Sequence, residues 1–156
     1  MELASYTRKD LIFFQLPGAN GPEVLSNFAA RLEQAGVVEN AQVLHRRLLE
    51  REELCSTGIG SGIAIPHCKF KKLKRPVLAV ATSARPIDFR ALDGKPVQVF
   101  FLLISPEDAP AEHLQVLSGL SKWIKEDPSA IDRIREAESA AAVYRMLGGT
   151  EEVPAP

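Results

Sequence analysis

The stretch that decides the fold covers residues 51–69 and reads REELCSTGIGSGIAIPHCK. Its three glycines stand at alternate positions, Gly58, Gly60 and Gly62. Because glycine tolerates backbone angles that other residues avoid, and lets a backbone approach a ligand closely, we expect an open loop here. The loop leads into a short buried strand over 63–65, which Pro66 ends. The sequence thus predicts that His67 is held at the end of a stiff element, beside backbone N–H groups that can face an anion.

Outward from this stretch, predicted strands and helices alternate. The apolar runs predict strands over 11–16, 77–82 and 96–104, the last of them central and buried on both faces. Helical spacing and capping residues predict helices over 22–35, 41–54 and 110–126. They also predict a short helix that begins at 131 and a last helix that runs from its Ser139 cap to 146. This order favours an α/β fold: a single-domain three-layer α/β/α sandwich around a mixed sheet, over 1–147. Residues 148–156 (GGTEEVPAP) have the composition of a disordered tail.

Bulk composition limits the class of protein. The chain has 156 residues, 46% of them hydrophobic, which is enough for one domain with a proper core. A net charge of −1 argues against bulk attraction to nucleic acid or to an anionic membrane. No apolar run is long enough to cross a bilayer, and the start lacks a secretory pattern, so we expect a cytoplasmic protein with no membrane insertion.

One local feature departs from that balance. Five of the seven residues over 69–75 (KFKKLKR) are basic. Such a run is typical either of a patch that binds phosphate or RNA, or of a solvated loop between strands. The near-neutral total charge favours the solvated loop.

Two histidines are the candidates for catalysis. A neutral imidazole is a nucleophile near pH 7 and can form covalent intermediates, so His67 could attack an electrophile if a backbone carbonyl holds its other nitrogen. His113 falls in the first turn of a predicted helix, where the helix dipole favours a neutral ring and a nearby anion. A packed structural role explains His113 equally well.

Three further residues could bind the oxygens of a phosphate. Arg51 could donate two N–H bonds to them, although an exposed arginine also suits a helix C-terminus. Ser56 and Thr57 could donate their hydroxyls, or could simply turn the backbone.

Two other kinds of site find less support. The spacing of GIGSG is not that of a dinucleotide or P-loop motif, and the Ile-Ala-Ile-Pro that follows cannot open a helix. A zinc site could draw on Cys55, His67, Cys68 and His113, but no pair of these shows the tight spacing of a zinc motif. We therefore expect no metal and no cofactor.

These residues resemble a known family. STGIGSGIAIPH, preceded by Arg51-Glu52, is similar to the active-site signature of phosphotransferase-system IIA proteins of the fructose/mannitol class, and most of all to their nitrogen-regulatory branch. The likeness continues through VLAVATSARPIDFRALDGKPVQVFFLLISP and HLQVLSGLSKWI, and it covers about 11–147. Ser61 stands where Asn or Glu is usual, and Cys68 where Gly or Ala is usual.

The resemblance implies a phosphotransferase component that works through a phosphohistidine. It implies that His67 accepts a phosphoryl group through Nε2 from an HPr-type carrier protein, that His113 helps to hold the group, and that Arg51 and Thr57 line the site. Three outputs remain open: a nitrogen, carbon or potassium signal to regulatory target proteins, transfer to a fructose- or mannitol-specific IIB, or a non-catalytic binding module.

Overall fold

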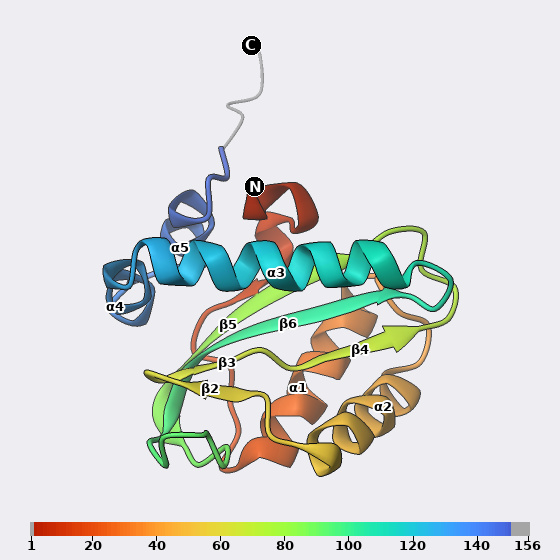
Figure 1. Ribbon diagram of the computed structural model, residues 1–156, viewed down its shortest axis with the longest axis horizontal. Coiled ribbons are helices and arrows are strands. Elements are labelled where there is room, and N and C mark those ends of the chain that lie inside the picture. The colour runs from red at the N-terminus through yellow and green to blue at the C-terminus, as the bar shows by residue number, and fades with distance from the viewer. Residues whose placement is uncertain (1, 151–156) are drawn as a thin grey trace.

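The computed structural model describes residues 2–150, and its elements form three layers with a mixed sheet in the middle (Figure 1). The strands are β1 (Ile12–Phe13), β2 (Gly58–Gly60), β3 (Ile63–Ala64), β4 (His67–Phe70), β5 (Val77–Ile87) and β6 (Val97–Pro106). The helices are α1 (Gly21–Gln34), α2 (Ala41–Leu54), α3 (Pro110–Glu126), α4 (Ser129–Arg135) and α5 (Ala140–Met146), with two 3-10 turns, η1 (Leu3–Tyr6) and η2 (Lys9–Leu11). The predicted three-layer α/β/α sandwich is confirmed.

Strand β6 is the centre of the sheet, as its apolar sequence predicts. The order is β1-β5-β6-β3-β2, and β4 pairs with the same edge of β6 as β3 does. Strand β5 is antiparallel to β6, whereas β1 is parallel to β5, and β3 and β4 are parallel to β6. Strands β3 and β4 therefore form one interrupted line beside β6, and the site lies where this line breaks.

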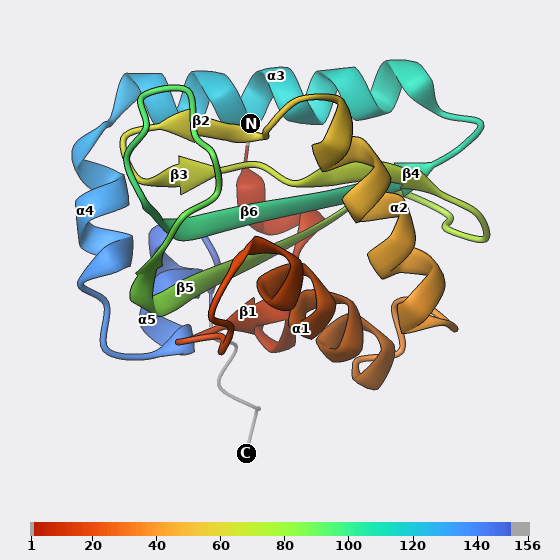
Figure 2. The ribbon, with the colours of Figure 1, turned by 90° about the horizontal axis from the view of Figure 1, so that it is seen from below.

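Alternating side chains of β6 enter two cores, because successive residues of a strand point to opposite faces. Phe100 and Leu102 pack with α1 and α2, and Val99 and Phe101 pack with α3, α4 and α5. Figures 1 and 2 show these two groups of helices on opposite faces of the sheet. Both faces of β6 are thus buried, and this packing fixes the position of the residues at the two ends of the strand.

The helices begin where capping chemistry predicts. The side chain of Asn20 accepts from the Glu23 N–H, that of Asn40 from the Gln42 N–H, and that of Ser139 from the Ala142 N–H. Helices α3 and α4 differ, since Ala109 and Pro128 at their starts offer no side-chain cap. None of the described helices is long and apolar enough to cross a membrane.

Some predicted boundaries are wrong. The first strand covers only two residues, because Gln15 adopts a positive φ of 51° that ends it. Strand β5 continues to Ile87 rather than 82, past an irregularity in its pairing with β6. Pro86, which has no N–H to pair, fits that loosened end. Of the predicted tail, residues 151–156 lie outside the described part of the chain.

Candidate functional site

His67 lies at the break between β3 and β4. It is the first residue of β4 and pairs with Leu103 of β6, so the prediction that it ends a strand is wrong: it begins one. Pro66 interrupts the line, yet its carbonyl still accepts from the Leu103 N–H at 2.9 Å. Residues 67–70, partly assigned to a loop from the sequence, are held in the sheet by β6. The backbone under the imidazole is therefore fixed on both sides of the proline.

The imidazole of His67 is held in one tautomer. Its Nδ1 lies 2.8 Å from the carbonyl oxygen of Ile65, and a carbonyl can only accept. Nδ1 therefore carries the proton, and Nε2 keeps its lone pair. Burial lowers the pKa of His67, and the charge of Arg51 adds to that effect, while the bond to Ile65 opposes it. The ring is thus neutral at pH 7 with Nε2 as a free nucleophile.

His113 faces His67 from the first turn of α3. The two ring centroids are 5.6 Å apart and the planes are tilted by 50°. His113 is 6% exposed, and its Nδ1 lies 2.6 Å from the Oγ of the buried Ser105. Burial, followed by the charges of His67 and Lys69, lowers the pKa of His113 to about 4. Sequence reasoning missed Ser105, although its place at the end of the central strand, eight residues before His113, was a usable signal.

Arg51 lies in the last turn of α2, where the sequence places it. Its Nη1 donates to the carbonyl of Cys55 at 2.8 Å, which satisfies the C-terminal end of the helix. Its charge also lowers the pKa of His67, so the guanidinium is close enough to act on the imidazole electrostatically. The structural role that the sequence allowed for Arg51 is therefore present, and its role at a phosphate stays a prediction.

The hydroxyls of Ser56 and Thr57 are engaged inside the protein. Ser56 Oγ donates to the carbonyl of Phe89 at 2.6 Å. Thr57 donates its hydroxyl proton to the carboxylate of Glu52, which also accepts from the Thr57 N–H at 3.0 Å. A hydroxyl has one proton, so neither side chain has one left for a phosphate in this conformation. Both residues shape the connection from α2 to β2 instead.

Glu52 was not among the predicted site residues. Burial raises its pKa, and its bonds to Thr57 and the charge of Arg51 oppose that rise. A half-buried carboxylate that accepts two bonds from one residue fixes that residue firmly. Its position next to Arg51 was the only signal in the sequence.

The glycine stretch forms a hairpin rather than an open loop. Strand β2 pairs antiparallel with β3, and the turn between them runs through Gly60, Ser61 and Gly62, all with positive φ. The Ser61 N–H donates to Asp93 at 2.9 Å, and the Gly58 N–H donates to Ser56 Oγ at 3.0 Å, so these N–H groups are occupied. A side chain at Gly58 would meet the Cα of Ala91 at 2.8 Å, so Gly58 allows the hairpin to pack closely. The N–H groups of Gly58 and Ser61 are thus not available to an anion in this conformation.

The thiol of Cys68 is buried behind His67, and burial raises its pKa to about 12. Cys55 is exposed. Among residues 2–150, no three His, Cys, Asp or Glu side chains are grouped so that they could hold a metal ion. The arrangement that remains is a neutral nucleophilic imidazole beside a second neutral imidazole and an arginine.

Comparisons with known proteins agree with this chemistry. Residues 5–149 match the family model described as "Phosphoenolpyruvate-dependent sugar phosphotransferase system, EIIA 2". A nitrogen regulatory protein of Pseudomonas aeruginosa is 38% identical over 132 residues, which are 85% of each chain. A fructose-specific EIIA component of Haloferax volcanii is 33% identical over 151 residues, 97% of each chain. The crystal structure of nitrogen regulatory protein IIA-Ntr from Neisseria meningitidis superposes with a TM-score of 0.83 at 30% identity, and covers 93% of this chain and 98% of that one.

Proposed function

Because the chain belongs to the EIIA 2 family of the phosphoenolpyruvate-dependent sugar phosphotransferase system, we propose that it accepts a phosphoryl group on Nε2 of His67. Members of this family are phosphotransferase components that transfer the group through a phosphohistidine. The observation that carries the assignment to His67 is the bond from its Nδ1–H to the Ile65 carbonyl, which leaves Nε2 unprotonated. The donor is a phosphohistidine on a small carrier protein of the HPr type.

The transfer needs no proton movement at the attacking atom. The lone pair of Nε2 forms the new P–N bond while the P–N bond of the donor breaks, and that electron pair returns to the donor imidazole. Positive charge develops on the His67 ring as the bond forms. The Ile65 carbonyl stabilises it by accepting from Nδ1–H.

His113 and Arg51 stabilise the transferred group. In phosphoryl transfer the charge spreads over three equatorial oxygens, and catalysis consists mainly of positioning and electrostatics. If Ser105 donates to Nδ1 of His113, the ring presents Nε2–H to a phosphoryl oxygen. Arg51 keeps donors beyond the one used on Cys55. Ser56, Thr57 and the glycines position these groups, and the hydroxyls of Ser56 and Thr57 do not bind the phosphoryl group.

The rim of the site suits a protein partner. Leu54, next to the Arg51 turn, is 82% exposed, and Leu114, next to His113, is 65% exposed. Exposed apolar side chains beside a reactive group favour transient docking of another protein. The carrier that brings the phosphohistidine would cover these two leucines.

The output we favour is a regulatory signal. Nitrogen regulatory proteins are among the relatives most similar to this chain, which supports a phosphorylation state that other proteins sense in the cytoplasm. The fructose-specific relative supports the alternative, in which the group passes on to a sugar-specific IIB.

The test is the intact mass of the protein after incubation with phosphoenolpyruvate, enzyme I and the HPr-type carrier. We expect a gain of one acid-labile phosphoryl group that is absent from His67→Ala and present in His45→Ala. Labelling of folded His67→Ala would move the acceptor elsewhere. Onward transfer to a IIB cysteine would favour the transport role over the regulatory one.

A further inference from the structure

A second hollow lies away from the two histidines, between the first residues of the chain and the β4–β5 loop. It is a cleft of about 380 Å³. Its walls come from Ser5, Tyr6, Thr7, Arg8, Leu11, Val37, Lys72, Leu73, Lys74, Arg75, Pro76 and Val77. His67, His113 and Arg51 are not among them, so this cleft is separate from the phosphoryl site.

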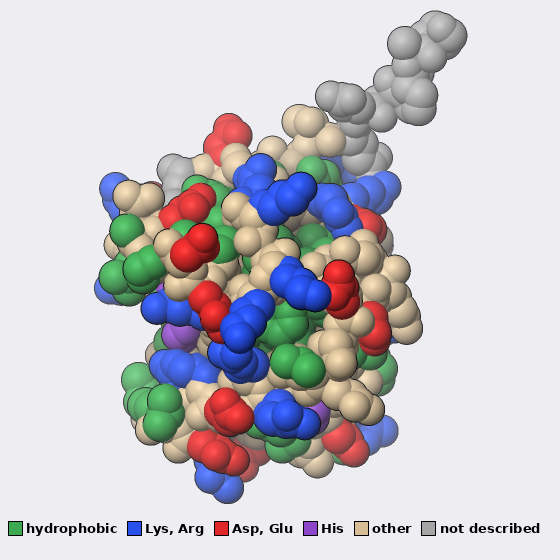
Figure 3. Space-filling model, turned by 90° about the vertical axis from the view of Figure 1, so that its right-hand side faces the viewer, with side chains coloured by type: hydrophobic (Ala, Val, Ile, Leu, Met, Phe, Trp, Pro, Cys, Tyr) green, Lys and Arg blue, Asp and Glu red, His purple; other side chains and the backbone are tan. Residues whose placement is uncertain are grey.

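The cleft is lined by cations. Arg8, Lys72, Lys74 and Arg75 contribute to the wall, and no acidic residue does. Arg8 pairs with Asp10 and Lys72 with Glu39, whereas Lys74 and Arg75 form no ion pair within the described chain. The loop lies at the end of the molecule seen in Figure 3, where many Lys and Arg side chains lie with Asp and Glu side chains among them. The cleft therefore carries an uncompensated positive charge, even though the whole chain is almost neutral.

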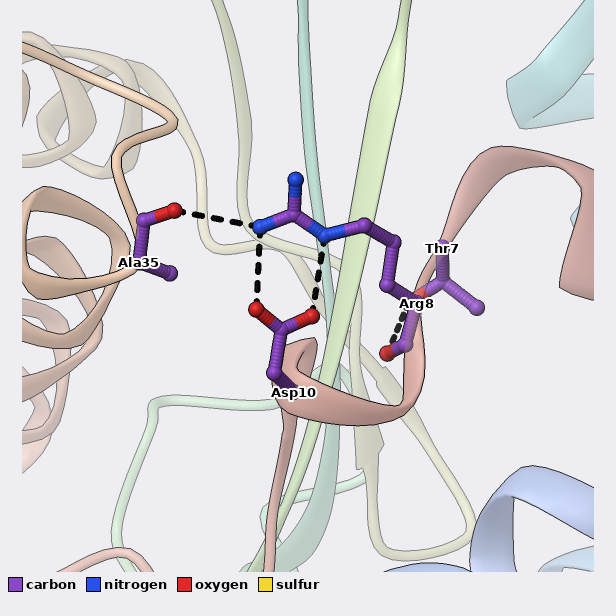
Figure 4. Close-up of polar contacts among 4 residues, drawn as sticks. All are labelled: Thr7, Arg8, Asp10 and Ala35. Carbon is purple, nitrogen blue, oxygen red and sulfur yellow. Dashed lines mark hydrogen bonds and ion pairs between the residues drawn. The ribbon is translucent and has the colours of Figure 1, made fainter. Parts of the chain in front are cut away.

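The two arginines of the cleft are already fixed in place. Arg75 donates from Nη2 to the Ser5 carbonyl at 2.6 Å, and its guanidinium lies 5.8 Å from the centre of the Tyr6 ring. Arg8 donates from Nε and Nη2 to the Asp10 carboxylate and from Nη2 to the Ala35 carbonyl. Figure 4 shows that Nη1 of Arg8 points away from both partners. Each guanidinium thus keeps free N–H donors, and little side-chain entropy remains to be lost when an anion binds.

The floor of the cleft is apolar. Leu11 is 2% exposed, and Val37, Leu73 and Val77 lie beside it in the lining. Pockets for small ligands usually measure about 300–1,000 Å³ and combine an apolar lining with a few polar groups that fix orientation. A bare inorganic ion would leave this apolar surface unused.

We propose that this cleft binds a small phosphate ester that carries a flat ring, of the size of a nucleoside monophosphate. Its phosphate lies between Arg75 and Lys74, where planar guanidinium donors match phosphate oxygens. Its ring lies on the partly buried side chains of Val37, Leu73 and Val77. The basic run over 69–75, for which the sequence favoured a solvated loop, is in part the wall of this site.

Titration of the full chain with adenosine monophosphate, followed by amide NMR shifts and calorimetry, tests the proposal. The His67→Ala background removes the phosphoryl-accepting imidazole from the measurement. We expect Lys74→Gln and Arg75→Gln each to weaken binding about tenfold, the usual effect of losing a hydrogen bond to a charged group. Lys71→Gln, the same charge change on the same loop but outside the cleft, leaves binding unchanged.

Two outcomes would overturn the proposal. One is the absence of binding by adenosine monophosphate at millimolar concentration. The other is an equal loss in Lys71→Gln, with a short RNA binding as well as the nucleotide, which would indicate a diffuse field on the surface. Because Arg75 also contacts Ser5, Lys74→Gln provides a second variant that leaves this contact between the loop and the N-terminal segment intact. Neither outcome bears on phosphorylation of His67.

Discussion

The two walls of the phosphoryl site are held in different ways. On one wall, His67 and His113 are mounted on β4 and on the start of α3, and the hydrogen bonds of β4 to the central strand fix the backbone there. On the other wall, the connection from α2 to β2 is held mostly by side chains: Glu52 binds Thr57, and Ser56 binds Phe89. The first wall, formed by β4 and the start of α3 and called the strand wall below, is thus held by backbone hydrogen bonds of the sheet. The second wall, formed by residues 55–57 and called the connection below, is held by a few individual side chains.

This difference separates chemistry from positioning. In the transfer that we propose, the strand wall supplies the reacting nitrogen and its neighbouring imidazole. The connection supplies a charge, Arg51, whose place depends on the local bonds around it. Substitutions in the first wall should therefore act on the rate of transfer, and substitutions in the second should act on how well the site is assembled.

Removal of the second imidazole should have the largest effect. His113→Ala takes away a donor at the transferred group, and we expect transfer to slow about 100-fold while some labelling remains. Rapid-quench measurement of transfer from the phosphorylated carrier gives the rate. His45→Ala, which removes a histidine on α2 that bonds to the Pro22 carbonyl, is the control. Equal rates for the two variants would show that His113 is structural only.

The same imidazole should make stability depend on pH. Its folded pKa of about 4 lies below the ordinary 6.5, so the unfolded chain takes up a proton between these values and the folded protein does not. The contribution is nil at pH 7, and stability falls as the pH drops through 6.5 towards 4. Between pH 7 and pH 5 we expect a loss of about 2 kcal/mol from this residue.

Urea unfolding at both pH values measures this loss. Other titrating groups contribute as well, so the relevant quantity is the loss in wild type minus the loss in His113→Asn. An identical pH dependence in both proteins would mean that the buried ring does not oppose its own protonation.

On the connection, Glu52→Ala should have a smaller effect of another kind. It leaves the Thr57 N–H and hydroxyl without their acceptor, which costs about 1–3 kcal/mol of stability. Transfer should slow about tenfold, mainly through a higher KM for the carrier, because the rim is displaced while the imidazoles are intact. The exposed neighbour Glu53→Ala is the matched control. A pure loss in kcat would instead place Glu52 close to the chemistry.

The sequence predicts the strand wall better than the connection, for a physical reason. Apolar periodicity locates β6 and α3, and the Pro66-His67 pair marks where the histidine is mounted. The roles of Glu52, Ser56 and Ser105 depend on contacts between side chains that only the folded chain brings together, such as Ser56 with Phe89, 33 residues away. The hairpin of the glycine stretch is local, since Gly58 pairs with Ala64 and Gly60 with Ile63, and it was missed because the three glycines were read as an open loop. Only the N–H partner of its turn, Asp93, is distant in the sequence.

The reactivities of the two cysteines allow a direct comparison of the walls, since Cys55 belongs to the connection and Cys68 to the strand wall. We expect an alkylating reagent at pH 8 to modify Cys55 in the folded protein and to reach Cys68 only after unfolding. Cys68 is buried, and with a pKa of about 12 only about one thiol in ten thousand is ionised at that pH. Mass spectrometry of wild type and Cys68→Ala follows each site. If both cysteines reacted at similar rates under native conditions, β4 would have to open as readily as the connection, and the contrast between a fixed wall and an adjustable one would fail.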